Sequence, residues 1–262
     1  MNSLNDALTI AQLIDNPTKR SETLSTIAQA AVSMNSLNDA LTIAQLIDNP
    51  TKRSETLSTI AQAAASKDDF ETSTIVAQLI DNNWIRDEVF DFVSQIAVSK
   101  GNFNSGVTIA EAIGDHKKRA EVLNIIAQTI LSKDNHSYAA IILQKAIQNA
   151  QSIEQIVSRD NTLVKIIPIV IYIDKNLALK LAQSIISDDL RIKTLIVVLE
   201  EYQEYDSHIL NIFQLEWNRC LTYDTVWVKL PLIIPLLKTH KWLGTMILEE
   251  EGWVNAQLKR LG

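Results

Sequence analysis

The sequence predicts an all-α fold, an α-solenoid of about six helix-turn-helix repeats with a helical C-terminal capping module. A segment of 33 residues recurs along the chain, which is typical of solenoids in which each unit contacts its neighbours. Apolar residues recur within it at spacings of three and four, as in amphipathic helices. The chain of 262 residues also has only six glycines and five prolines, too few for many tight turns.

The repeat starts at the first residue and is then duplicated almost without change. Residues 1–33 and 34–66 differ only at Val32 and Ala65. Two further units follow without a gap, a fifth has about seven extra residues, and a sixth is recognisable but less regular. We therefore expect a repeat domain over residues 1–200, with units 1–33, 34–66, 67–99, 100–132, 133–172 and 173–200.

Each unit is expected to be a helical hairpin. Apolar residues stand at unit positions 4, 7, 8, 10, 11 and 14, and again at 24, 27, 28 and 31. Ser3 precedes Asp6 by three residues, an arrangement similar to a capping box at the start of the first helix. Asn16 followed by Pro17 places an N-cap before a proline at the first position of the second helix.

The period, the two-helix pattern and the placing of the apolar positions resemble the tetratricopeptide-like α-solenoids, whose hairpins repeat every ~34 residues. The resemblance covers residues 1–200. Ankyrin repeats share the 33-residue period, but their Thr-Pro-Leu-His signature is absent. HEAT-type repeats remain an alternative.

Residues 201–262 differ in composition and predict a separate module. Four of the five tryptophans are here, together with the single cysteine, Cys220. One interpretation is a cap that covers the apolar face of the last hairpin. The other is a partner-binding module, because tryptophan is enriched at interface hot spots. The tryptophans are Trp217, Trp227, Trp242 and Trp253.

Polar residues form a stripe at the second, fifth, ninth and twelfth unit positions of the first helix. The resemblance implies that this face lines a concave groove and binds a ligand. Amide and hydroxyl groups both donate and accept hydrogen bonds, which suits a peptide backbone; the alternative is an ordinary solvated helix face. The second position holds Asn2, Asn35, Asp68 and Gly101. The predicted partner-binding residues are Asn5, Gln12, Asn38, Thr42, Gln45, Glu71, Gln78, Asn104 and Glu111.

One arginine recurs at the same place in each unit. A ladder of this kind can bind anions, but aspartates recur five residues earlier at Asp15, Asp48 and Asp81. We therefore favour a structural role, in which each guanidinium group binds a carboxylate or carbonyl group of the turn. The arginines are Arg20, Arg53, Arg86, Arg119, Arg159 and Arg191.

The sequence lacks the motifs of common catalytic and metal sites. The four histidines, His116, His136, His208 and His240, have no metal-ligand spacing. Glycine-rich phosphate loops and the Gly-x-Ser-x-Gly motif are absent as well. We expect no enzymatic activity, no cofactor and no metal.

Charge and hydropathy narrow the expected partners and location. A net charge of −7 argues against nucleic acid as a partner, since such binding relies on clustered basic residues. The longest apolar run, at 230–237, is far shorter than the ~20 residues of a spanning helix. With no apparent targeting segment, we expect a cytoplasmic protein.

These observations predict a non-catalytic scaffold that binds a protein or peptide in a concave groove. One alternative is an enzyme or enzyme accessory resembling the HEAT-type chromophore lyases, with Cys220 or His240 as the reactive residue. The other is a self-associating structural protein. The first unit keeps the apolar residues that an internal unit buries against its predecessor. This predicts a homodimer through the N-terminal repeat, because a second chain could cover them. The residues expected at this contact are Leu4, Leu8, Leu24 and Ile27.

Overall fold

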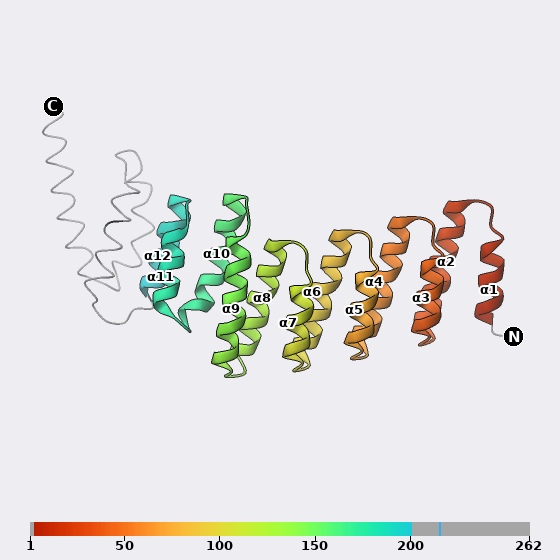
Figure 1. Cartoon of the computed structure of the whole chain (residues 1–262), viewed down its shortest axis with the longest axis horizontal. Coiled ribbons are helices and arrows are strands. Elements are labelled where there is room, and N and C mark those ends of the chain that lie inside the picture. Colours follow the sequence, from red (N-terminus) through yellow and green to blue (C-terminus); the bar gives the residue numbers. More distant parts are fainter. Residues whose placement is uncertain (1–2, 201–214, 216–262) are drawn as a thin grey trace, which may run out of the picture. The chain divides into compact units, whose positions relative to one another are not determined.

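The structure, a computed structural model, describes residues 3–200 and residue 215. The described chain forms successive antiparallel helical hairpins (Figure 1), and no strand occurs within these residues. The prediction of an all-α, solenoid-like array is confirmed. The predicted module at 201–262 lies outside the described residues, apart from Leu215.

In each of the first four hairpins, the first helix is short and the second helix is long. The first helices are α1 (Ser3–Gln12), α3 (Leu37–Gln45), α5 (Phe70–Gln78) and α7 (Phe103–Glu111). The second helices are α2 (Pro17–Ser33), α4 (Pro50–Ser66), α6 (Asn83–Ser99) and α8 (His116–Leu131). The chain continues with α9 (His136–Gln151), α10 (Ile156–Ile171), α11 (Lys175–Ser184) and α12 (Asp188–Glu200).

The start of each long helix α2, α4, α6 and α8 is fixed by a side-chain cap. Asn16 accepts a hydrogen bond from the backbone N–H of Lys19 at 3.0 Å, and Asn49 does the same for Lys52. Asn82 and Asp115 cap α6 and α8 in the same way. Each cap satisfies an N–H that has no partner inside its own helix. The Asn-Pro signal in the sequence is thus confirmed for α2 and α4.

The end of each of these helices is a left-handed turn, which corrects one part of the predicted stripe. Asn35, Asp68 and Gly101 have φ angles of 66°, 66° and 85°. The next residue in each case donates its N–H to a carbonyl five residues earlier, as Ser36 does to Ala31 at 2.9 Å. This is a Schellman ending, for which glycine and asparagine are suited. The second unit position therefore lies in this turn and not on the first helix.

Stacked hairpins bury alanine and branched aliphatic residues between them. Ala11, Ala44 and Ala77 are fully buried at one unit position of the first helices, and Ile47 and Ile80 are buried where these helices end. Gly106 allows α7 to approach α6, because an added Cβ would lie 2.9 Å from the backbone oxygen of Ser94. Small residues therefore set how closely successive hairpins stack.

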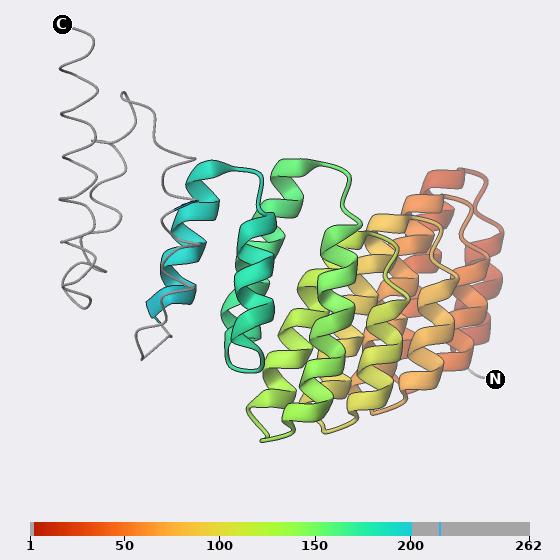
Figure 2. The ribbon, with the colours of Figure 1, turned by 60° about the vertical axis from the view of Figure 1, so that its left-hand side comes forward.

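The described helices fall into two compact units, α1–α9 within residues 1–154 and α10–α12 from residue 155 onward. The predicted unit 133–172 is thus divided between them. Its extra residues lengthen the first helix, since α9 has 16 residues and α7 has nine. This longer helix packs along α8. Figure 2 shows α1–α9 from a second direction.

Candidate functional site

All of the predicted partner-binding residues are exposed, and all of them lie on the first helices α1, α3, α5 and α7. The amide groups of Gln12, Gln45 and Gln78 have no hydrogen-bonding partner among the described residues. A leucine follows each glutamine, and Leu13, Leu46 and Leu79 are 77%, 40% and 42% exposed. The exposed residues are Asn5, Gln12, Asn38, Thr42, Gln45, Glu71, Gln78, Asn104 and Glu111. We call this surface the first-helix stripe.

Residues of α9 contact the far end of the first-helix stripe. The Tyr138 hydroxyl donates a hydrogen bond to Asn104 Oδ1 at 2.8 Å. Lys145 Nζ forms an ion pair with Glu111. These two stripe residues therefore already have partners inside the chain. The part on α1, α3 and α5 remains available to a ligand.

The long second helices contact one another more extensively than the short first helices do. Neighbours among α2, α4, α6 and α8 pack directly against one another, whereas neighbours among α1, α3, α5 and α7 make few direct contacts. The placement of the first-helix stripe in a concave groove stays a prediction.

A second polar surface follows the second helices, and the sequence analysis did not single it out. Six unit positions are identical in all four of the first hairpins. The alanine and isoleucine positions are packed in or beside the core, and the arginine position contacts the turn. The other three hold glutamate, glutamine and serine on the solvent side of the second helices. A comparison of the four unit sequences could have revealed this surface, because these positions are identical in units that differ elsewhere.

Part of this second surface is held by contacts within the chain. The hydroxyl group of each of the four serines donates a hydrogen bond to a backbone carbonyl of its own helix. This contact accounts for serine at this position. Glu55 forms an ion pair with Lys52 at 2.9 Å. Gln95 donates to the carboxylate of Asp91. The glutamate position consists of Glu22, Glu55, Glu88 and Glu121.

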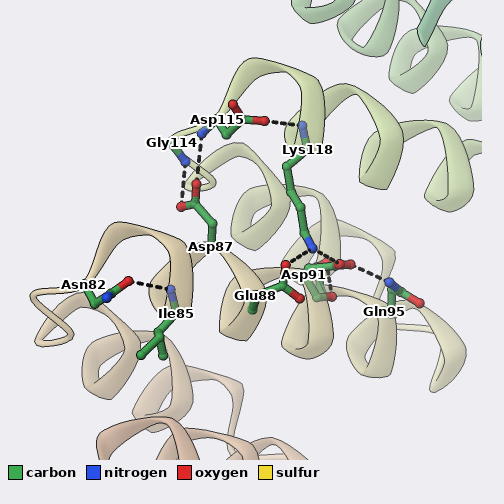
Figure 3. A network of polar contacts seen from close by, with 10 residues as sticks. Asn82, Ile85, Asp87, Glu88, Asp91, Gln95, Gly114, Asp115 and Lys118 are labelled. Atoms are coloured by element: carbon green, nitrogen blue, oxygen red, sulfur yellow. Dashed lines mark hydrogen bonds and ion pairs between the residues drawn. The ribbon is translucent and has the colours of Figure 1, made fainter. Parts of the chain in front are cut away.

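A charged cluster joins α6 to α8 on this surface (Figure 3). Lys118 Nζ reaches from α8 to both Glu88 and Asp91 on α6, at 3.0 Å from Asp91 Oδ2. Burial lowers the pKa of Lys118, but its hydrogen bonds to Glu88 and Asp91 outweigh burial and raise the pKa above the ordinary lysine value of 10.5. Lys118 is therefore charged at neutral pH and links two consecutive hairpins.

An open hollow of about 460 Å³ lies beside this cluster. Its lining comes from α6 and combines two carboxylates with two apolar side chains. Phe92 within it is 40% exposed. The lining residues are Glu88, Asp91, Phe92, Gln95, Ile96 and Ser99.

The arginine ladder has the structural role that the sequence favoured. Arg20 Nη1 donates to the backbone oxygen of Ile14 at 3.0 Å, and Arg53 repeats this contact with Ile47. The carboxylate partner differs from the expected one, because Arg20 pairs with Asp48 of the next hairpin at 2.5 Å and not with Asp15. Arg86, Arg119 and Arg191 also bind the carbonyl six residues earlier, and Arg159 lies 3.8 Å from Asp160.

A buried aspartate one residue after the arginine also links hairpins. Asp87 accepts the backbone N–H groups of Gly114 and Asp115, both at 2.9 Å (Figure 3). Asp160, which is fully buried, accepts those of Ile186 and Ser187. These carboxylates satisfy turn donors that have no partner in their own helix. They therefore hold the turn of the next hairpin against the helix that precedes it.

The residues predicted for self-association are half-buried or buried. Leu24 is fully buried, so its prediction as a contact residue is wrong: the stack of hairpins already covers it. Leu4, Leu8 and Ile27 are half-buried. The most exposed apolar residues of the first hairpin are Ile10 and Leu13, at 67% and 77%.

The histidines in the described residues each lie within hydrogen-bonding distance of one oxygen atom. His116 Nδ1 lies 3.3 Å from Asn149 Oδ1, and His136 Nδ1 lies 3.3 Å from the Asp134 carbonyl. Over residues 3–200 and 215 there is no cluster of three histidine, cysteine or acidic residues that could hold a metal. Cys220, His208 and His240 lie outside the described residues.

The helices and the two surfaces define this chain, over its described residues, as an all-α protein of repeated helical hairpins. None of the described helices has both the length and the apolar character needed to cross a membrane. No protein-family model matches the chain, and no curated protein sequence matches it.

The solved structure of BtubC (BKLC) from P. vanneervenii is similar to this chain. The sequences are 12% identical, and the match covers 84% of this chain and 89% of that chain with a TM-score of 0.35.

Proposed function

We propose that the protein is a non-catalytic scaffold that binds a peptide segment of another protein, with a tetratricopeptide-like organisation of its hairpins. The observation that carries the proposal is the repeated pair of an exposed glutamine at the end of α1, α3 and α5 and an exposed leucine directly after it. The amides are available for hydrogen bonds to a peptide backbone, and the leucines offer apolar contacts beside them. A surface repeated at every hairpin suits an extended ligand that spans several units.

The test compares binding with stability. Random peptides displayed on phage would be selected on the intact protein, and the affinity of a selected peptide would be measured for the parent and for the triple variant Asn38→Ala, Gln45→Ala and Gln78→Ala. We expect at least a tenfold loss of affinity, or about 1.4 kcal/mol. The melting temperature should stay nearly constant, because all three side chains are exposed and exposed substitutions usually change stability by less than ~0.5 kcal/mol.

A matched control lies on the other helix layer. Thr26→Ala and Thr59→Ala alter exposed positions of α2 and α4 and should leave the affinity unchanged. If selected peptides bind the triple variant as tightly as the parent, the first-helix stripe is not the binding surface.

Self-association is the second candidate function, and the exposure of Ile10 and Leu13 favours it. In the next hairpin, which has the same local sequence, Ile43 is only 2% exposed because hairpin 1 covers it. Two chains that meet at this face would form a closed dimer about a two-fold axis. We expect light scattering over a concentration series to show a dimer for the parent and a monomer for the variant Ile10→Lys, Leu13→Glu. A monomeric parent would refute this second candidate.

A further inference from the structure

One side of α6 is an exposed apolar and acidic surface, and we call it the α6 face. It consists of Trp84, Glu88, Asp91, Phe92, Gln95 and Ile96. The spacing of four residues puts Trp84, Glu88 and Phe92 on the same side of the helix. Trp84 is 72% exposed and Phe92 is 40% exposed. Such aromatic side chains are typical anchors of protein interfaces.

The internal duplication supplies a reference for this face. Hairpin 2 has small residues where the α6 face has large ones: Ser58 and Thr59 correspond to Asp91 and Phe92. Ala63 likewise corresponds to Ile96. Both α4 and α6 have 17 residues, and neither Thr59 nor Phe92 is in the core. Core packing therefore does not require the larger side chains of hairpin 3.

The hollow in the α6 face is an open depression of about 460 Å³ that is lined by side chains of this one helix. Phe92 and Ile96 provide apolar contacts inside it, while Glu88 and Asp91 add carboxylates. An apolar side chain next to a cationic group fits this lining.

The charge beside the hollow is negative in spite of the neighbouring lysine. Glu88 and Asp91 contribute two carboxylates to its lining. One ammonium group, that of Lys118, pairs with both of them, which leaves an excess of one negative charge. An incoming lysine or arginine would therefore be attracted to this side of α6.

We infer that the α6 face is a second docking site, and that its ligand is a basic peptide segment of a partner protein with an apolar side chain beside lysine or arginine. The apolar side chain enters the hollow against Phe92 and Ile96. The basic side chains pair with the carboxylates of Glu88 and Asp91. This site is on the second-helix layer, so it is separate from the first-helix stripe and does not depend on it.

The test uses three short fluorescein-labelled peptides and fluorescence anisotropy on the intact protein. The first peptide combines lysine and leucine, the second has serine in place of leucine, and the third has glutamate in place of lysine. We expect the lysine–leucine peptide to bind at least about tenfold more tightly than either of the others, because each loses one of the two interactions. Equal binding of the lysine–leucine and lysine–serine peptides would mean charge attraction alone and would overturn the proposal.

The duplicated hairpin provides the matched variant. Asp91→Ser, Phe92→Thr and Ile96→Ala together restore the residues of hairpin 2, which the same fold already accommodates. We expect this variant to keep its helix content by circular dichroism and to lose at least about tenfold in affinity for the lysine–leucine peptide. Unchanged affinity in the folded variant would overturn the proposal.

Two further variants separate this site from the first-helix stripe. The triple variant of Asn38, Gln45 and Gln78 should bind the lysine–leucine peptide within twofold of the parent. A parallel loss there would assign the peptide to the stripe and overturn the α6 site. Phe92→Ala alone is a milder change at a partly exposed position, and it should lower the affinity even where the triple replacement on α6 alters folding.

Discussion

The two nearly identical hairpins allow the stacking energy to be measured with one substitution made at two places. Ile10 and Ile43 occupy the same unit position within the same local sequence. Ile10 is 67% exposed and Ile43 is 2% exposed, because only the second has a hairpin packed before it. Isoleucine to alanine at each place therefore removes the same atoms from different surroundings.

The expected difference follows from the buried area. Alanine removes three carbon groups, worth about 0.8 kcal/mol each when buried, so Ile43→Ala should cost about 2.4 kcal/mol before any cavity term. Ile10 is about one-third buried, so Ile10→Ala should cost about 0.8 kcal/mol. Changes in helix propensity cancel in the comparison, since the neighbouring residues are the same. The difference is about 1.6 kcal/mol, and the cavity at Ile43 can only increase it.

Denaturant unfolding followed by circular dichroism would measure both costs. Thr9→Ala and Thr42→Ala form the control pair, because both threonines are exposed and both donate to the carbonyl four residues earlier at 2.9 Å. Their costs should agree within ~0.5 kcal/mol. Equal costs for Ile10→Ala and Ile43→Ala would refute the reasoning, and would mean that another surface covers Ile10 in solution.

Three other outcomes are expected. A chain that starts at Met34 should remain helical and lose the equivalent of one hairpin and one interface by circular dichroism; loss of all helix would contradict the nearest-neighbour picture. Asp87→Ala should lower the free energy of unfolding by about 1–3 kcal/mol, because the N–H groups of Gly114 and Asp115 lose their acceptor. Asp87→Ser should lose less, and equal losses would argue against these bonds. Lys118→Met should melt below the parent at neutral pH. Because the pKa of Lys118 is raised on folding, this difference should be complete below pH 10.5 and shrink as the pH rises through the raised pKa; a constant difference would exclude the ion pairs as its cause.

Sequence reasoning found only part of the candidate site. The first-helix stripe was found because polar residues at its positions recur with the helical period. The α6 face was missed because Trp84, Phe92 and Ile96 are apolar, and apolar residues on a helix are normally assigned to the core. Their exposure depends on how neighbouring helices are spaced, which no local pattern contains.

The sequence by itself determined the fold class, the hairpin unit and the starts of the second helices. These features depend on contacts within a few residues, such as the Asn16 cap and the apolar spacing of each helix. The tertiary structure decided which partner each charged group takes. Arg20 binds Asp48, which is 28 residues away, and not Asp15, which is five residues away, because stacking brings the next turn within reach of the guanidinium group that also binds the Ile14 carbonyl of its own turn. The same stacking buries Leu24 and brings Lys118 to Glu88, whereas Ile10, which has no hairpin packed before it, stays exposed. The side of a hairpin that meets solvent is fixed only when its neighbours are in place.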